Sequence, residues 1–173
     1  MACMTRKKCI ASHLFLLNVL LVPAGAHADS IEGKVSVIDG SSFQIVESGL
    51  TVKLFGVSAC AINQRAHYQG ISWPCGAVAA GWLTENTLGY TIRCLKEGAG
   101  GYATVLGRCF LPDGSDVAKK ALAEGMAIAA REKGILIVPE YESFEKIARS
   151  KFLGIWSSTF KLDGQTYRKS FTQ

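Results

Sequence analysis

Residues 35–60, VSVIDGSSFQIVESGLTVKLFGVSAC, decide the fold of this chain. Apolar side chains that alternate with polar ones on both sides of a tight turn are typical of a β-hairpin. Here the alternating apolar residues are Val35, Val37, Phe43 and Ile45. The turn between them is Asp39-Gly40-Ser41-Ser42, which combines the residue types that favour tight turns. The stretch therefore predicts two antiparallel strands.

A third strand is expected directly after this hairpin. Residues 51–57, TVKLFGV, are again β-branched and apolar, and residues 58–60 begin a loop. The 39–42 turn and the loop that begins at residues 58–60 are expected to meet. Polar side chains in these two segments are therefore the first candidates for a functional site.

The order of these parts resembles the opening of the staphylococcal-nuclease-like (thermonuclease) family. That family begins with a strand, an Asp-Gly-Asp-Thr turn, a strand, and an Arg-Leu-x-Gly-Ile-Asp-x-Pro-Glu segment. The matching segments here read VIDGSS at residues 37–42 and KLFGVSACA at residues 53–61. Further on, AEGMA at 123–127 is similar to a family helix end, and residues 141–156 are similar to its last helix and tryptophan.

The resemblance covers residues 31–160 and implies an α+β fold. The fold of the family is a five-stranded OB-type β-barrel with three helices packed on it. The remaining sequence agrees with this order. Helices are expected after Pro74, after the N-cap Asp116 and after Pro139, and an antiparallel strand pair is expected at residues 90–95 and 104–111.

Three details of these elements are also predicted. The first helix should bury Val78, Ala79, Trp82 and Leu83. The last helix should bury Tyr141, Phe144, Ile147 and Ala148, with Glu142–Lys146 and Glu145–Arg149 as ion pairs on its outside. Residues 61–73 have the composition of a loop, and 127–138 show no clear pattern.

The chemistry that the family needs is altered in this sequence. Family enzymes cleave nucleic acids with one calcium ion, two arginines and a glutamate, because a hard cation needs oxygen ligands and guanidinium groups match a phosphate. By resemblance, the two calcium carboxylates of the family correspond to Ser41 and Ser58. The glutamate corresponds to Ala61, and the two arginines correspond to Lys53 and Thr104. No catalytic residue, metal site or cofactor is therefore predicted. Calcium is expected only if nuclease activity survives.

Three residues stay candidates for ligand binding. Asp39 either caps its own turn or is a surviving metal ligand. Lys53 keeps the positive charge of a family arginine, and Tyr102 matches a family tyrosine that lines the nucleotide pocket. His67 is expected to be an ordinary surface residue rather than a general base.

The N-terminus predicts export. Arg6, Lys7 and Lys8 precede an apolar run at 10–22, and Ala26-His27-Ala28 is a signal-peptidase pattern. The run is short for a membrane anchor. We expect a signal peptide at 1–28, cleavage near Ala28, a periplasmic or secreted protein without a transmembrane segment, one domain at 29–160 and a polar tail at 161–173.

Export bears on charge and on the cysteines. Removal of residues 1–28 lowers the net charge from +5 to +2, and the remaining basic excess lies between Lys146 and Lys169. Two of the six cysteines are also removed. The other four are an even number in an exported protein, which predicts disulfides rather than a zinc site, since none forms a Cys-x-x-Cys pair. The expected pairs are Cys94–Cys109, on opposed antiparallel strands, and Cys60–Cys75, between the loop and the first helix.

Three functions remain open at this point. The first is a noncatalytic module that binds an anionic polymer, either nucleic acid or an acidic polysaccharide. The second is an accessory protein of exopolysaccharide production, because small secreted nuclease-like proteins of succinoglycan biosynthesis are similar. The third is a residual calcium-dependent nuclease.

Overall fold

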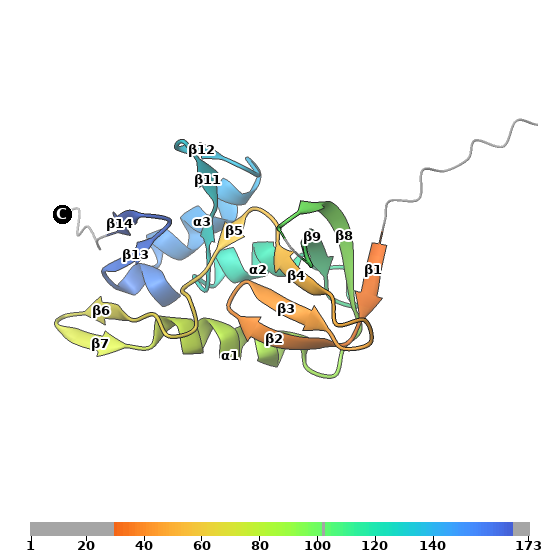
Figure 1. Ribbon diagram of the computed structural model, residues 1–173. Coiled ribbons are helices and arrows are strands. Elements are labelled where there is room, and N and C mark those ends of the chain that lie inside the picture. The colour runs from red at the N-terminus through yellow and green to blue at the C-terminus, as the bar shows by residue number, and fades with distance from the viewer. Residues whose placement is uncertain (1–29, 102, 168–173) are drawn as a thin grey trace, which may run out of the picture.

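A six-stranded, strongly curled sheet lies at the centre of the fold (Figure 1). The computed structural model describes residues 30–101 and 103–167. In sheet order the strands are β1 (Ser30–Gly33), β8 (Ile92–Ala99), β9 (Thr104–Phe110), β4 (Thr51–Leu54), β3 (Ser42–Ile45) and β2 (Val35–Asp39). All pairs are antiparallel except β4 with β9, which is parallel.

The two edge strands of this sheet are consecutive in the chain. Only Lys34 separates β1 from β2, yet β1 pairs with β8 and β2 pairs with β3. One bent N-terminal strand thus serves both edges, and the sheet curls as a barrel does. Counted as one strand, β1 and β2 reduce the six strands to the five that were predicted. Gly33 permits the bend, because a Cβ there would lie 2.6 Å from Ile45 Cγ2.

Within the part of the chain that the structure describes, three α-helices pack around the sheet, which confirms the predicted α+β, OB-like fold. They are α1 (Cys75–Thr87), α2 (Val117–Ala123) and α3 (Tyr141–Ser150), and the short 3-10 helix η1 (Gly154–Ser157) follows. Asp116 caps α2 as expected, because its carboxylate accepts hydrogen bonds from the backbone N–H groups of Ala118 and Lys119 at 2.8 and 3.1 Å.

The buried faces of two helices differ in part from the prediction. In α1, Val78 is exposed, and Cys75, Gly76 and Thr87 are buried instead. In α3, Ile147 is exposed and Glu145 is buried. The apolar pattern predicts a buried face from large apolar residues. The buried positions that it missed are held by a short or polar side chain or by the Glu145 carboxylate, so the predicted face was rotated away from the true one.

Among residues 30–101 and 103–167, eight short strands form pairs outside the main sheet. These pairs are β5 (Val57–Ser58) with β10 (Ile128–Ala129), β6 (Ala66–Tyr68) with β7 (Ile71–Trp73), β11 (Arg131–Glu132) with β12 (Ile135–Leu136), and β13 (Phe160–Leu162) with β14 (Gln165–Tyr167). The expected loop at 61–73 therefore contains a hairpin, and the unassigned stretch 127–138 contains three strands.

The expected polar tail at 161–173 is also corrected. Residues 160–167 form the β13–β14 hairpin, in which Phe160 and Leu162 are buried. The ring of Tyr167 stacks on that of Phe160, with ring centroids 4.8 Å apart. Two buried apolar residues stabilise this hairpin although its composition is polar, so the folded unit extends to at least Tyr167.

Two apolar cores result from this arrangement. The barrel core lies between the sheet and the helices and includes Phe43, Val52, Leu83, Ile92 and Tyr141. The second core joins segments from both ends of the domain: Cys60, Ala66, Cys75, Ile128, Ala148, Ile155, Trp156, Phe160 and Leu162. Figure 1 shows the β6–β7 and β13–β14 hairpins together at the end of the molecule away from β1.

Each core contains one of the two predicted disulfides, and both are confirmed. Cys94 and Cys109 lie directly opposite each other on β8 and β9 and are fully buried in the barrel core. Cys60 and Cys75 join the segment after β5 to the start of α1, with the Cα atoms 5.9 Å apart. The sulfur atoms thus cross-link each core internally.

The predicted signal peptide at 1–28 lies outside the described residues. Within residues 30–101 and 103–167, no helix is both long enough and apolar enough to span a bilayer.

Candidate functional site

The first candidate position, Ser41, lies in the turn between β2 and β3. The Asp39 carboxylate accepts hydrogen bonds from the Ser41 N–H at 2.8 Å and from the Ser41 hydroxyl at 3.1 Å. The carbonyl of Ser41 accepts a hydrogen bond from the Leu54 N–H at 2.8 Å. Asp39 thus caps the turn with its own side chain, which favours the structural alternative for this residue.

Lys53 and Thr104 lie on neighbouring strands. In the parallel β4–β9 pair, Thr104 is opposite Thr51 and Lys53 is opposite Leu106. Residues two positions apart on a strand point to the same face. Lys53 and Thr104 therefore share the face of the sheet away from the buried Val52, with Lys53 exposed and Thr104 half-buried.

Ser58 and Ala61 belong to the segment that follows β4. Ser58 is half-buried on β5, and Ala61 is exposed just after the Cys60 disulfide. This segment packs on the Asp39–Ser41 turn, since a Cβ added to Gly40 would lie 2.9 Å from the Cβ of Ala59. The fold thus places all five candidate positions on the turn, the two strands and the segment that meet in this region.

The five candidate positions carry three hydroxyl groups, one methyl group and the ammonium group of Lys53. Calcium in proteins takes six to eight oxygen ligands, several of them carboxylates. Within the described residues no group of three or more histidine, cysteine, aspartate or glutamate side chains is placed to hold a metal ion. The residues present do not fit the calcium site of the family.

Tyr102 and His67 are the other two residues that the sequence singled out. Tyr102 lies outside the described residues. His67 is an exposed residue of β6, and its backbone pairs with Thr159 through hydrogen bonds of 2.9 and 2.8 Å. The backbone of His67 thus links the β6–β7 hairpin to the C-terminal segment.

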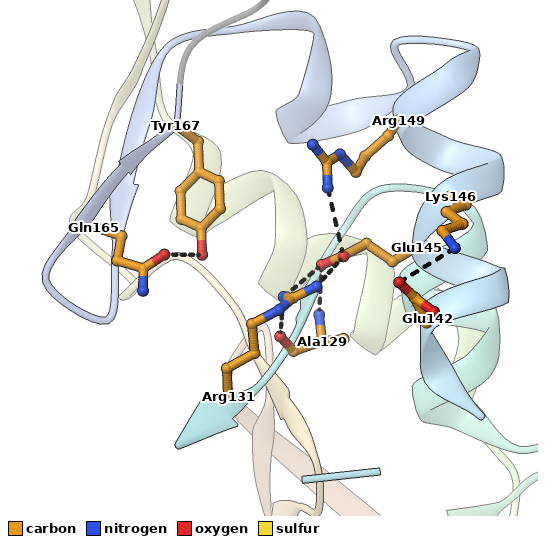
Figure 2. A network of polar contacts seen from close by, with 8 residues as sticks. All are labelled: Ala129, Arg131, Glu142, Glu145, Lys146, Arg149, Gln165 and Tyr167. Carbon is orange, nitrogen blue, oxygen red and sulfur yellow. Dashed lines mark hydrogen bonds and ion pairs between the residues drawn. The ribbon is translucent and has the colours of Figure 1, made fainter. Parts of the chain in front are cut away.

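A buried ion pair was missed by the sequence analysis. Glu145, expected on the outside of α3, is only 1% exposed. Its carboxylate accepts hydrogen bonds from the Ala129 N–H at 2.9 Å and from Arg131 Nη2 at 2.6 Å, and Arg149 Nη1 is 4.0 Å away (Figure 2). This hydrogen bonding to Glu145 raises the pKa of Arg131 against the opposing effect of burial.

The spacing of Tyr141, Glu145 and Ala148 was the available signal for this burial. These residues lie four and three positions apart and so share one helix face. The expected pairs Glu142–Lys146 and Glu145–Arg149 are both confirmed, at 3.2 and 4.0 Å, but the Glu145 carboxylate is buried rather than on the outside. Glu145 instead fixes α3 to the β10–β11 segment, which is a structural role.

The basic excess at the C-terminal end surrounds the second core. The guanidinium of Arg149 lies over the ring of Trp156, 4.9 Å from its centroid. Lys151 after α3 and Lys161 on β13 are exposed. Arg168 and Lys169 lie outside the described residues. Exposed positive charge therefore lies around the second core, separate from the Asp39–Ser41 turn in the sequence.

Comparison with known proteins identifies the class to which this fold belongs. The model of the family described as staphylococcal nuclease homologue matches residues 51–158, and this chain belongs to that family. The matched segment includes Lys53, Ser58, Ala61 and Thr104 but not Ser41. A curated relative is the succinoglycan biosynthesis protein ExoI of Rhizobium meliloti (strain 1021). It is 32% identical over 149 residues, which are 82% of this chain and 72% of that protein.

Proposed function

We propose that this protein is an exported, noncatalytic accessory module of exopolysaccharide production that binds an anionic polymer. The observation that carries the proposal is the replacement of the family's catalytic groups. Ser41, Ser58 and Ala61 stand where carboxylates are needed, Thr104 replaces an arginine, and Lys53 keeps only a charge. A nuclease fold without its reactive groups keeps its scaffold and its surface for binding.

The polymer class is inferred from the relative and from the charge. The relative is described as a succinoglycan biosynthesis protein, and succinoglycan is an exopolysaccharide. Exposed Lys151 and Lys161 supply positive charge near the second core. An acidic polysaccharide agrees with the description of the relative and with the positive charge. Nucleic acid is the competing ligand for the surface around Lys151 and Lys161.

Export is the third part of the proposal. The N-terminal sequence has the features of a signal peptide, and the two disulfides are of the kind that form and persist in oxidising compartments. Mass spectrometry of protein from the periplasm or culture medium should find a chain that begins near Asp29. A chain retaining residues 1–28 in the cytoplasm contradicts export.

Loss of nuclease chemistry is tested directly. Removing one electrostatic stabiliser of a transition state typically costs about 10²- to 10³-fold in rate. Purified mature protein should therefore leave single-stranded DNA intact in calcium, while an active family nuclease cleaves it under the same conditions. Cleavage that stops in chelator and is lost in Asp39→Ala supports residual nuclease function and overturns this part of the proposal.

Polymer binding is tested with matched charge reversals. Lys151→Glu and Lys161→Glu should each weaken binding of an oligogalacturonate and reduce its salt dependence. Lys133→Glu, on the exposed β11–β12 turn, changes the net charge equally and should leave binding within about twofold. Equal weakening by all three variants indicates nonspecific attraction only. Preference for single-stranded DNA over oligogalacturonate points to nucleic acid instead.

The accessory role has its own test. Deletion of the gene should lower the yield or change the chain length of the exopolysaccharide, and the wild-type gene and Asp39→Ala should both restore it. Unchanged exopolysaccharide after deletion contradicts the accessory role. Restoration by wild type but not by Asp39→Ala, in a variant whose thermal unfolding matches the wild type, contradicts a noncatalytic mechanism. Failure of Asp39→Ala together with a less stable fold shows only the loss of the turn cap.

A further inference from the structure

A hollow of about 600 Å³ lies away from the family's catalytic positions. It is formed by the second half of α1, the segment after α1, the β9–α2 connection and α2. Pockets of about 300–1,000 Å³ are the usual size for small ligands. None of the five altered catalytic positions lines it. The hollow is therefore a separate feature of this fold.

Two aromatic rings line the hollow. Trp82 on α1 is half-buried, and Tyr90 after α1 is 51% exposed. The indole Nε1–H of Trp82 donates a hydrogen bond of 2.6 Å to Glu124, the C-cap residue of α2. This bond fixes the edge of the indole, so the ring is held in place before any ligand arrives. Aromatic side chains combine an apolar face with a polar edge, which suits partly polar ligands.

The polar groups of the hollow are also held in position. Lys120 Nζ lies 2.8 Å from Glu124 Oε1. Burial disfavours the charged form of Glu124, but the hydrogen bonds from Lys120 and Trp82 outweigh it and lower the pKa of this carboxyl. Asn86 donates from its side-chain amide to the carbonyl of Trp82 at 2.8 Å. The walls thus present preorganised carboxylate, amide and ammonium groups.

The β9–α2 connection provides a further fixed wall. The Asp113 carboxylate accepts hydrogen bonds from the Ser115 N–H at 2.9 Å and from the Ser115 hydroxyl at 2.6 Å. These hydrogen bonds lower the pKa of Asp113. With Glu85 on the exposed side of α1, the lining carries three carboxylates against the one ammonium of Lys120. Such a lining repels an anionic ligand.

We propose that this hollow binds an uncharged sugar unit of an oligosaccharide chain. A pyranose ring has a C–H face that packs on an aromatic ring and hydroxyl groups that donate to carboxylates and amides. Trp82 and Tyr90 supply the rings, and Glu85, Asn86 and Asp113 supply the acceptors. The site deepens the proposed function by assigning the hollow to an uncharged unit of the polysaccharide, while charged units contact the exposed lysines. For its occupant's class it rests in part on that function. Its geometry stands independently.

Calorimetric titration with cellotriose, a neutral glucose trimer, tests the site. Tyr90→Ala should weaken binding about tenfold, within the range found when an aromatic ring that stacks on a nucleic-acid base is removed. Tyr68→Ala, which removes the same side chain from β6 outside the hollow, should leave binding within about twofold. Because Tyr90 is half-exposed, its variant should fold, and thermal unfolding of both variants checks this.

A second measurement does not depend on any variant. In the wild-type protein, cellotriose should shift the NMR resonance of the Trp82 indole N–H, while the indole resonances of Trp73 and Trp156 stay in place. Absence of binding, or equal effects of Tyr90→Ala and Tyr68→Ala, overturns the site. Tighter binding of a cationic glucosamine trimer, lost in Tyr90→Ala, overturns the uncharged assignment.

The outcomes separate this site from the proposed function. Cellotriose binding in a protein whose gene deletion leaves exopolysaccharide unchanged supports the site and contradicts the accessory role. If deletion lowers exopolysaccharide but the protein does not bind cellotriose, the accessory role is supported and the site is contradicted.

Discussion

The barrel core and the second core are built differently although each contains one disulfide. The barrel core consists of alternating strand residues and helix faces that follow one another along the chain. The second core combines Ala66, Ile128 and Phe160, which belong to three separate short strands. Local pattern therefore specifies the first core, whereas the second depends on long-range contacts between segments that carry weak patterns of their own.

The largest expected difference comes from removing one phenylalanine from each core. Phe43 is fully buried in the barrel core, and Phe160 is 3% exposed in a short hairpin of the second. Phenylalanine-to-alanine changes in cores cost about 3–5 kcal/mol. We expect Phe43→Ala near the upper end and Phe160→Ala near the lower end, because a terminal hairpin can shift to fill the space.

Urea unfolding gives both free energies, and amide hydrogen exchange locates the effect. Phe160→Ala should lose protection in β6, β7, β13 and β14 while β8 and β9 stay protected. Equal loss of protection throughout the chain in both variants means that the two cores unfold as one unit, and the distinction fails.

The second prediction concerns Glu145, which connects α3 to the β10–β11 segment. Glu145→Ala leaves the Arg131 charge and the Ala129 N–H without this acceptor, and breaking a buried ion pair costs about 3–5 kcal/mol. Glu142→Ala, three residues earlier on the same helix, removes an exposed pair worth only about 0.3–0.5 kcal/mol. The loss of unfolding free energy in Glu145→Gln should lie between the losses in these two variants. Equal unfolding free energies for Glu145→Ala and Glu142→Ala contradict the structural role.

The third prediction compares the disulfides. Both link residues 15 positions apart, for which the chain-entropy contribution is about 3 kcal/mol each. Cys94→Ala/Cys109→Ala should cost more than Cys60→Ala/Cys75→Ala, because it also removes two fully buried sulfur atoms from the barrel core. Thermal unfolding of the two double variants measures the difference. A larger loss from the Cys60–Cys75 pair reverses the ranking.

The smallest predicted effect is a pH dependence in the barrel core. Burial, together with the nearby Asp116 carboxylate, raises the pKa of Tyr141. In the unfolded chain a tyrosine titrates near pH 10. Above that pH the unfolded chain loses a proton that the folded protein retains. The stabilisation is therefore complete below about pH 10 and is lost as the pH rises toward the folded pKa.

Tyr141→Phe isolates this contribution. The variant loses the 3.2 Å hydrogen bond to Asp116, which costs about 1 kcal/mol at neutral pH. The difference in unfolding free energy from the wild type should shrink between pH 10 and 11, as measured by urea unfolding. A difference that stays constant over this range contradicts a raised pKa.

The comparison also explains which predictions from the sequence were correct. The hairpin around Asp39-Gly40, the Cys94–Cys109 pairing and the cap at Asp116 depend on neighbouring residues or on adjacent strands. Their signals are complete within a short window of sequence. The β6–β7 and β13–β14 hairpins were missed because their strands are only three residues long. Each hairpin is stabilised by packing in the second core and by the backbone pairing of His67 with Thr159, which lie far apart in the sequence.

The candidate site divides in the same way. The candidate positions Ser41, Lys53, Ser58, Ala61 and Thr104 come from the sequence, because a resemblance aligns residue types, and the loss of catalytic groups there stays a prediction. The hollow at Trp82 and Tyr90 could not, because its lining comes from a helix, a loop and a second helix that only folding brings together.

The sequence by itself determined the family, through the resemblance of its motifs. It also determined the main sheet, the three helices and both disulfides, because strand alternation, turn residues and the pairing of adjacent strands act locally. Only the tertiary structure decided that Glu145 is buried, that residues 160–167 belong to the folded unit, and that Trp82 lies in the wall of a hollow. These features follow from the packing of distant segments. A buried carboxylate and a polar hairpin are stable only when partners such as Arg131 and Trp156 are present.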